Sequence, residues 1–476
     1  MRNFSLLLDY YELTMAYSYY CQNKHEDEAV FDVFFRDIPD KGGYAIYAGL
    51  EQIIDYINTF KFQEEELDYL RKKNTFSEDF ISYLKELKMS LTIYSMKEGT
   101  PIFPNEPIMI VRGPLLQCQL VETFILLTLN HQSLIATKAS RITMVSKGRT
   151  IMEFGARRAQ GYDAANYGAR AAYIGGVFGT SNTYADYLYD IPALGTMAHS
   201  YVQSYKTEYE AFLAYAKTYP NNTVLLVDTY NTLKKGIPNA IRVHNEFLKP
   251  NGYYLKGIRI DSGDLAYLSI EARKLLDAAG LFDTKITVSN SLDEYSIRTL
   301  LNQGACIDSF GVGERLITAK SDPVFGGVFK LSALMEDGIL VPKIKISDNV
   351  QKMTTPGFKQ VHRMYDENNK AIGDVVTLFE EVIDDKKPYL LFDPLYPWKQ
   401  KEITNYKSKK LLETIFLNGK LVYQKPDLIK IRDYAKESLD TLWKEMTRLE
   451  FPHQYYVDLS QELWDLKQSL IVKHNE

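Results

Sequence analysis

Short apolar runs alternate with amphipathic helical segments between residues 150 and 310, and this repeat constrains the fold more than any other feature. Three clear examples are Thr223–Asp228, Gly257–Asp261 and Lys285–Ser289, each followed by a helical pattern. Helices are also predicted over residues 162–174 and 200–218. About seven such strand–helix pairs fit into this region. Repeated units of this length build a parallel sheet, and this number of units favours a closed α/β barrel over an open sheet.

The segments on either side of this repeat have a different character. Residues 1–130 mix helical patterns with short strands, and residues 336–476 begin with strands and charged turns, such as Ile344–Asp348. A single helical segment is predicted over residues 432–470. We therefore predict an N-terminal α+β domain (1–130), a barrel (131–335) and a C-terminal segment (336–476), in agreement with the two or three domains expected for 476 residues.

Composition excludes several classes of protein. A formal net charge of −5 argues against a nucleic-acid-binding surface. The three cysteines form no CxxC pair, which indicates neither a disulfide framework nor a zinc site and favours a reducing compartment. The N-terminal apolar run is too short for a signal peptide, and no apolar stretch reaches the roughly 18 residues of a membrane span. We expect a cytoplasmic protein that binds neither nucleic acid nor membranes.

Polar residues follow the predicted strands, at the edge that carries the active site in α/β barrels. They are Arg157, Ser181, His199, Asp228, Arg259, Asp261, Ser289 and Asn290. His199 is one of only 7 histidines and lies among small residues in Gly195–Ser200, so another molecule can approach its ring, which can act as a nucleophile, a proton carrier or a metal ligand. A packed structural histidine is the alternative. Asp228 ends an apolar strand and is placed either to orient the His199 ring or to cap a helix.

Two strings suit an aromatic ring and phosphate groups. Phe154 can stack on a planar heterocycle and Arg157 can hold a phosphate through two hydrogen bonds; a core phenylalanine beside surface arginines is the alternative. Arg259 and Asp261 alternate with apolar residues and therefore point to the same side of their strand. This pair suits a ribose phosphate with bound magnesium, and an internal salt bridge is the alternative.

Small residues at three further strand ends indicate either phosphate loops or ordinary turns. Ser289-Asn290 and Gly311–Glu314 end consecutive strands, where backbone amides can surround a monophosphate. Gly179–Asn182, which contains Ser181, also fits a simple helix cap.

Taken together, these strings resemble the nicotinate phosphoribosyltransferase family over most of the chain, from Asp9 to about Leu331. The matching strings are Tyr10–Met15, Phe34–Arg36, Gly113–Leu115, Glu153–Gly161, Gly179–Asn182, Gly195–Ser200, Arg259–Asp264 and Gly311–Gly313. The resemblance implies an irregular α/β barrel beside a sandwich domain built from both chain ends. It implies transfer of phosphoribose from phosphoribosyl pyrophosphate to nicotinate, with Mg²⁺ and with coupling to ATP hydrolysis, as in ATP-coupled ligases of NAD biosynthesis. It also implies a homodimer with shared active sites.

The resemblance further implies a role for each matching residue. His199 would accept a phosphoryl group from ATP, with Asp228 orienting its ring. The implied substrate contacts are Phe154 and Arg259 beside the pyridine ring, Tyr11 from the neighbouring subunit, Thr196 on nicotinate, Arg157 on phosphate, Asp261 on ribose, and Ser289, Asn290, Gly313 and Glu314 around the sugar phosphate. Magnesium would be held through the substrate phosphates, with Asp261 and Asp264 as candidate ligands.

Two positions bear on substrate choice. Relatives that use nicotinamide carry an aspartate where this chain has Ser181, and a hydroxyl can donate to the carboxylate of nicotinate whereas an aspartate would repel it. Glu314 departs from the family pattern, in which threonine is common, and its carboxylate must turn away from phosphate, toward Arg315 or magnesium. A nicotinamide or quinolinate phosphoribosyltransferase, and a nucleotide-sensing barrel or dimeric scaffold without turnover, remain the alternatives.

Overall fold

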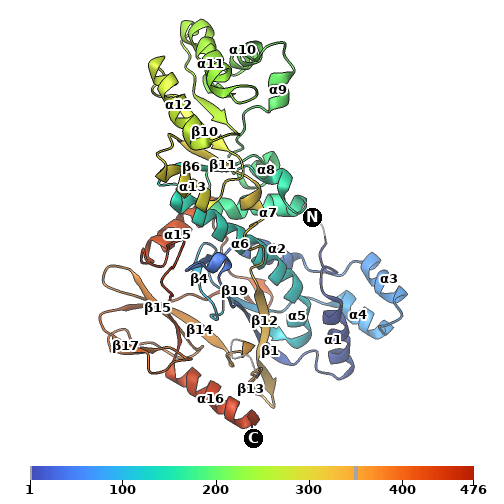
Figure 1. Cartoon of the computed structure of the whole chain (residues 1–476). Coiled ribbons are helices and arrows are strands. Elements are labelled where there is room, and N and C mark those ends of the chain that lie inside the picture. Colours follow the sequence, from blue (N-terminus) through green and yellow to red (C-terminus); the bar gives the residue numbers. More distant parts are fainter. Residues whose placement is uncertain (1–2, 348–351, 476) are drawn as a thin grey trace. The chain divides into compact units, whose positions relative to one another are not determined.

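The computed structural model describes residues 3–347 and 352–475, and these form two compact units (Figure 1). The first unit contains residues up to 134 together with residues from 324 onward, and the second contains residues 135–323. Helix α6, Glu122–Val145, carries the chain from the first unit into the second.

The first unit is built on sheets whose strands are antiparallel, except for the parallel pair β15–β21. Its largest sheet has seven strands in the order β13-β12-β1-β5-β3-β19-β20 and joins both ends of the chain. These strands are β1 (Glu28–Phe35), β3 (Thr92–Ser95), β5 (Met109–Pro114), β12 (Gly327–Glu336), β13 (Ile339–Pro342), β19 (Glu413–Leu417) and β20 (Lys420–Leu421). A second sheet, in the order β18-β14-β15-β21, contains β14 (Lys359–Tyr365), β15 (Ala371–Leu378), β18 (Lys407–Lys410) and β21 (Val457–Leu459). Two further two-stranded antiparallel sheets are formed by β2 (Ala45–Ile46) with β4 (Pro101–Ile102) and by β16 (Tyr389–Phe392) with β17 (Gln400–Ile403).

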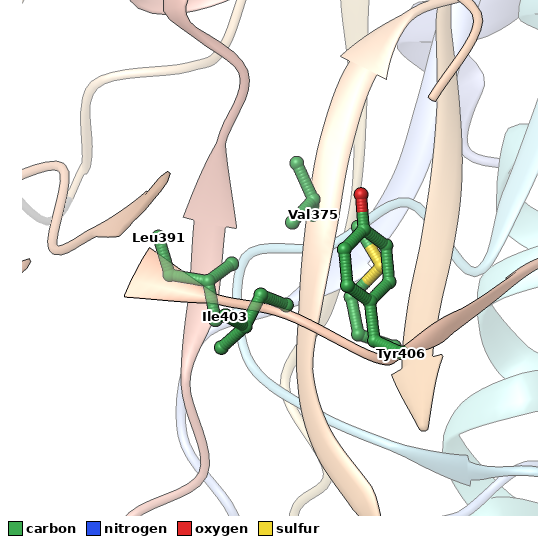
Figure 2. Packing of buried hydrophobic residues seen from close by; sticks show 5 residues of the cluster. Val375, Leu391, Ile403 and Tyr406 are labelled. Atoms are coloured by element: carbon green, nitrogen blue, oxygen red, sulfur yellow. The ribbon is translucent and has the colours of Figure 1, made fainter. Parts of the chain in front are cut away.

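Helices and small apolar clusters complete this unit. The helices are α1 (Tyr10–Cys21), α2 (Leu50–Thr59), α3 (Glu64–Lys72), α4 (Glu78–Glu86), α5 (Leu115–Leu120), α15 (Leu428–Asp440) and α16 (Gln461–Asn475). Figure 2 shows one cluster, in which Val375 of β15 packs with Leu391, Ile403 and Tyr406 from the β16–β18 region. Burial of such side chains is the main force that holds a small sheet of this kind to its neighbours.

The second unit is a parallel sheet covered by helices. Its six strands, in the order β7-β6-β11-β10-β9-β8, are β6 (Thr150–Glu153), β7 (Gly179–Thr180), β8 (Val224–Leu226), β9 (Gly257–Ile260), β10 (Lys285–Ser289) and β11 (Ser309–Val312). The helices are α7 (Tyr162–Ile174), α8 (Thr183–Tyr189), α9 (His199–Gln203), α10 (Glu208–Thr218), α11 (Ile237–Val243), α12 (Leu265–Ala278), α13 (Glu294–Asn302) and α14 (Glu314–Ile317).

The predicted α/β class is confirmed, whereas closure of the sheet into a barrel is not. A single parallel bridge, Thr180 to Ala193, extends the β7 edge. Within the described residues no strand pairing joins this edge to β8 at the other side. The described strand pairings therefore leave the sheet open between these two edges.

Local sequence explains why the strands and helices of this unit meet where they do. Asp264 caps α12 by accepting from Tyr267 N at 3.0 Å, and Asp293 forms a capping box with Ser296 at the start of α13. The buried carboxylate of Glu294 accepts from Lys138 at 2.8 Å and from Arg141 at 3.1 Å. These ion pairs bind the second half of α6 to the start of α13.

Three expectations about secondary structure were wrong. The predicted helix over 432–470 is two helices, α15 and α16, separated by β21, and Phe451 between them has a positive φ of 50° that a helix cannot contain. The predicted strand Ile344–Asp348 has no strand pairing over residues 344–347, and Asp348 lies outside the described residues. The helix predicted after residue 200 is interrupted between Gln203 and Glu208, where Thr207 caps α10.

Candidate active site

The carboxyl ends of the six parallel strands lie along one edge of the sheet, because all neighbouring pairs run in the same direction. Glu153 ends β6, Thr180 ends β7, Ser289 ends β10 and Val312 ends β11. In open and closed α/β sheets this edge carries the ligand site. The polar residues predicted from the sequence follow directly after these strands.

Three of the predicted residues form a closed hydrogen-bonded group. Arg259 donates to Asp261 Oδ1 at 3.1 Å and, through Nε, to Ser289 Oγ at 3.0 Å. Ser289 in turn donates to Asp261 through a short hydrogen bond. Ser289 is buried, with 4% of its surface exposed, and its hydroxyl both donates and accepts within the group. The Ser289 hydroxyl therefore bridges Arg259 and Asp261, and its contact with substrate stays a prediction.

Phe154 and Arg259 form the wall expected for a planar ring. The Arg259 guanidinium lies 5.7 Å from the centroid of the Phe154 ring. The ring packs directly over Gly311, where an added Cβ would lie 2.4 Å from a ring carbon. Any larger residue at position 311 would therefore displace Phe154, which explains the glycine at this strand position. An aromatic face and a guanidinium of this kind can bind a flat, negatively charged heterocycle.

His199 is the first residue of α9, and its ring is 40% exposed. Its Nδ1 lies 3.1 Å from Thr229 Oγ1, and its Nε2 lies 4.0 Å from Asp261 Oδ2. The ring therefore has one hydrogen-bonded edge and one edge that faces a carboxylate and solvent.

Asp228 does not make the predicted contact with His199. Its Oδ2 accepts from Asp261 N at 2.8 Å and from Ser262 Oγ at 2.6 Å. Its Oδ1 is buried and has no hydrogen-bond partner among the described residues. Successive residues at a strand end point to opposite sides, so Asp228 turns to the 261–262 loop and Thr229 turns to the histidine. The predicted role of Asp228 is corrected to support of that loop.

The phosphate-binding candidates lie at two other loops of the same unit. Arg157 is exposed in a short turn after β6 and makes no hydrogen bond or ion pair with the described part of the chain. Asn290 is exposed and has a positive φ of 107°, in the turn directly after β10. Both residues are available to an incoming anion.

Glu314 follows Gly313 and turns away from that loop. Its carboxylate accepts from Lys320 at 2.7 Å, and this contact lowers the pKa of Glu314. Arg315, which we considered as its partner, pairs instead with Asp293. Lys320 thus partly neutralises the Glu314 carboxylate, which would otherwise repel a bound phosphate.

The remaining predicted residues are placed as follows. Ser181 is exposed, and its backbone N–H donates to Glu153 O at 2.8 Å. Thr196 is half-buried and makes a long 3.5 Å contact to Met197 O. Asp264 is exposed at the start of α12. Tyr11 belongs to α1 of the other compact unit, where burial and Glu122 raise its pKa.

Thr229, Glu153 and Thr180 are additional residues at this edge that the sequence reasoning did not assign. Thr229 contacts the histidine ring, and Glu153 accepts a hydrogen bond from Thr180 at 2.6 Å. Thr229 directly follows Asp228, which we predicted as the partner of His199. The end of the apolar strand therefore indicated the right place in the sequence, one residue away from the right side chain. Glu153 ends an apolar strand, but a buried carboxylate at such a place cannot be distinguished by pattern from an exposed one.

Metal binding at this site would depend on the substrate. The described residues contain no group of three or more His, Cys, Asp or Glu side chains arranged to hold a metal ion. Mg²⁺ that arrives on a phosphate requires only one or two carboxylates from the protein, because water and phosphate oxygens fill the other positions. Asp261 and Asp264 fit that limited requirement, although Asp261 Oδ1 already accepts two hydrogen bonds.

Comparison with known proteins gives consistent similarities along the chain. Sequence models for the N-terminal domain, the family region and the C-terminal domain of nicotinate phosphoribosyltransferase (NAPRTase) match residues 6–130, 149–371 and 358–467. The chain is 47% identical to nicotinate phosphoribosyltransferase of Bacillus subtilis (strain 168), over 98% of this chain and 95% of that protein. It is 30% identical to the Homo sapiens nicotinate phosphoribosyltransferase, over 98% of this chain and 96% of that protein.

Solved structures share the fold. The crystal structure of human nicotinic acid phosphoribosyltransferase superposes with a TM-score of 0.87 at 29% identity, over 97% of this chain and 99% of that one. The nicotinate-nucleotide pyrophosphorylase from Pyrococcus furiosus has a TM-score of 0.71 at 22% identity, over 92% and 95% of the two chains, and shows a likeness of fold alone. In the described part of this chain, no helix combines the length and the apolar character needed to cross a membrane.

Proposed function

This chain belongs to the nicotinate phosphoribosyltransferase family, and we propose that it forms nicotinate mononucleotide and pyrophosphate from nicotinate and phosphoribosyl pyrophosphate, as a step of NAD biosynthesis. The observation that carries this proposal is the 47% identity to the Bacillus subtilis enzyme over 98% of the chain. The family model that matches residues 149–371 spans every residue of the strand-end site.

The site chemistry supports the transfer step. Breaking the bond between ribose C1 and pyrophosphate creates a cation-like sugar, so the protein must place the pyridine nitrogen behind C1 and stabilise the departing pyrophosphate. Phe154 and Arg259, 5.7 Å apart, provide the surface for the ring. Arg157, which is exposed and makes no hydrogen bond or ion pair with the described residues, provides a guanidinium for phosphate.

Nicotinate is the favoured pyridine because of the groups near this surface. Ser181 carries a hydroxyl that can donate to a carboxylate, and Arg259 carries a positive charge. A carboxamide would gain less from both groups, since it has no negative charge.

We propose further that ATP phosphorylates His199. The ring nitrogen Nε2 is the one that is not held by Thr229, and 40% of the side chain is exposed. With the proton on Nδ1, where it donates to Thr229 Oγ1, Nε2 carries the lone pair that attacks the terminal phosphorus of ATP. A P–N bond forms, the bond from this phosphorus to the bridging oxygen breaks, and ADP leaves. Magnesium would enter on the phosphates of ATP and phosphoribosyl pyrophosphate, supply positive charge to the leaving groups, and be held by Asp261 and Asp264.

We also propose a homodimer in which Tyr11 of one subunit completes the site of the other. Tyr11 is 46% exposed on α1, and an exposed tyrosine of this kind suits an interface. Size-exclusion chromatography with light scattering tests the dimer, and a monomer in solution would contradict it.

Pyrophosphate release measures the proposed activity. The purified protein is supplied with phosphoribosyl pyrophosphate and Mg²⁺ and with nicotinate, nicotinamide or quinolinate, each with and without ATP. Turnover with nicotinate, stimulated by ATP, is the expected result. Preference for nicotinamide, turnover of quinolinate, or binding without turnover would each replace the proposal.

The variant His199→Asn isolates the ATP step. We expect it to lose ATP stimulation and to retain some basal transfer, because asparagine cannot accept a stable phosphoryl group. Full ATP stimulation in this variant would show that His199 is not the phosphoryl acceptor.

A further inference from the structure

Glu153 is a fully buried acidic residue at the end of β6, beside the candidate site but without a direct role in the transfer described above. Burial raises the pKa of this carboxyl group, which is the expected penalty for a charge removed from water. A residue that carries such a penalty needs compensating hydrogen bonds, and Glu153 has them.

The Glu153 side chain connects two neighbouring strand ends. Its Oε2 accepts from Thr180 Oγ1 at 2.6 Å, and its Oε1 accepts from the backbone N–H of Gly155 through a short hydrogen bond. Its carbonyl oxygen accepts from Ser181 N at 2.8 Å. One residue thus holds the turn after β6 and the end of β7.

The residues that follow these contacts are the two that we assign to the nicotinate pocket. Glu153 and Thr180 are register partners in the parallel ladder. Phe154 directly follows β6 and Ser181 directly follows β7, so both lie just beyond the last pair of the ladder. Their separation is therefore set by the contacts of Glu153.

We propose that Glu153 is a positioning residue that fixes the gap between Phe154 and Ser181 and thereby the preference of the pocket for a pyridine carboxylate over a pyridine carboxamide. This inference rests on the proposed function. Glu153 does not touch the substrate; it acts through Gly155, Thr180 and the backbone of Ser181.

Two variants remove the connection in different ways. Glu153→Gln keeps the shape but directs an NH₂ group at one of the two donors, which leaves a buried donor without an acceptor. Thr180→Val keeps the volume and removes the hydroxyl, which donates to Glu153 at 2.6 Å and accepts from Asn182 N at 3.0 Å. For both we expect the KM for nicotinate to rise about tenfold, with kcat within about twofold of the wild type. The ratio of kcat/KM for nicotinate to that for nicotinamide should fall by a similar factor, because the strand end that carries Ser181 loses the support of the hydrogen bond between Thr180 and Glu153.

Thr180→Ser is the matched control, because it retains the hydroxyl, and we expect wild-type kinetics from it. Thermal unfolding of each variant is recorded alongside, and if Glu153→Gln does not fold, the comparison of Thr180→Val with Thr180→Ser decides. Unchanged KM and unchanged selectivity in Thr180→Val, with nicotinate turnover by the wild type, would overturn this inference alone. A wild type that does not use nicotinate would overturn the proposed function and this inference with it.

Discussion

Replacing Asp261 by asparagine tests whether the hydrogen-bonded group at the strand ends supports catalysis. Asn keeps the size of the side chain and one carbonyl oxygen, but it removes the negative charge that faces Arg259, Ser289 and His199. The hydrogen bond from Arg259 to Asp261 measures 3.1 Å, and Nε2 of His199 lies 4.0 Å from the second carboxylate oxygen.

The size of the effect follows from the loss of charge. A hydrogen bond to a charged group contributes about 1.5–3 kcal/mol and a neutral one about 1 kcal/mol, so each of the two bonds weakens by about 0.5–2 kcal/mol. Asp261 is 31% exposed, and solvent screening reduces the sum to about 1–2 kcal/mol. Since about 1.4 kcal/mol corresponds to a factor of ten, we expect kcat/KM for nicotinate to fall roughly 5- to 30-fold.

Steady-state pyrophosphate release, with nicotinate and phosphoribosyl pyrophosphate varied separately, measures this change. Asp277→Asn is the matched control, because it removes one carboxylate from an Arg–Asp pair on the outer helix α12, where Arg273 donates to Asp277 at 2.8 Å. We expect wild-type kinetics from the control. If folded Asp261→Asn enzyme keeps kcat/KM within twofold of the wild type, the hydrogen-bonded group does not organise the site and our reasoning is wrong.

Three further predictions concern stability and substrate affinity. Arg363 donates to both carboxylate oxygens of buried Asp374 at 2.8 and 2.7 Å, so Arg363→Met should lower the free energy of unfolding by about 3–5 kcal/mol in urea denaturation, and a loss below about 1 kcal/mol would contradict this. Burial lowers the pKa of His362 to about 4. As the pH decreases from about 6.5 to 4, the unfolded state binds a proton before the folded state does, so the free energy of unfolding should fall. His362→Phe should remove up to about 2 kcal/mol of that loss, measured by urea unfolding at several pH values. Glu314→Gln should lower the KM for phosphoribosyl pyrophosphate about two- to fivefold in steady-state assays, because the carboxylate beside the phosphate loop is only partly neutralised by Lys320; an unchanged KM would place the phosphate elsewhere.

The sequence predicts the first and last residues of a helix or strand well where local residues end it. The strand Lys285–Ser289 and the helix predicted over 162–174 match the structure to the residue, because an apolar run and a helical pattern there end in polar or glycine-containing turns. The break in the C-terminal helical pattern also has a local signal, which the helical periodicity alone does not include. Pro452 follows Phe451, and a proline removes a helical N–H donor and disfavours the helical conformation of the residue before it.

The candidate site shows the same division. The sequence predicts which residues follow the strands, because the end of an apolar run is a local property. It does not predict which of two consecutive residues turns toward a neighbour, since that depends on where the strand pairing stops. The choice between Asp228 and Thr229 as the partner of His199 rests on this one-residue difference.

The position of His199 between Thr229 and Asp261 links the proposed phosphorylation to the nicotinate surface. A phosphoryl group adds a charge of roughly −1.5 to −2, and on Nε2 it would arrive at the edge of the ring that faces Asp261, 4.0 Å away. Repulsion at this distance weakens the hold of Asp261 on Arg259 and Ser289, unless a cation enters between the two anions. Magnesium brought by the substrate phosphates is such a cation, so phosphorylated His199 and bound phosphoribosyl pyrophosphate would stabilise each other. Whether Asp261 keeps its hydrogen bond with Arg259 would then depend on this cation. The position of Arg259 in turn would determine how firmly the pyridine ring is held against Phe154.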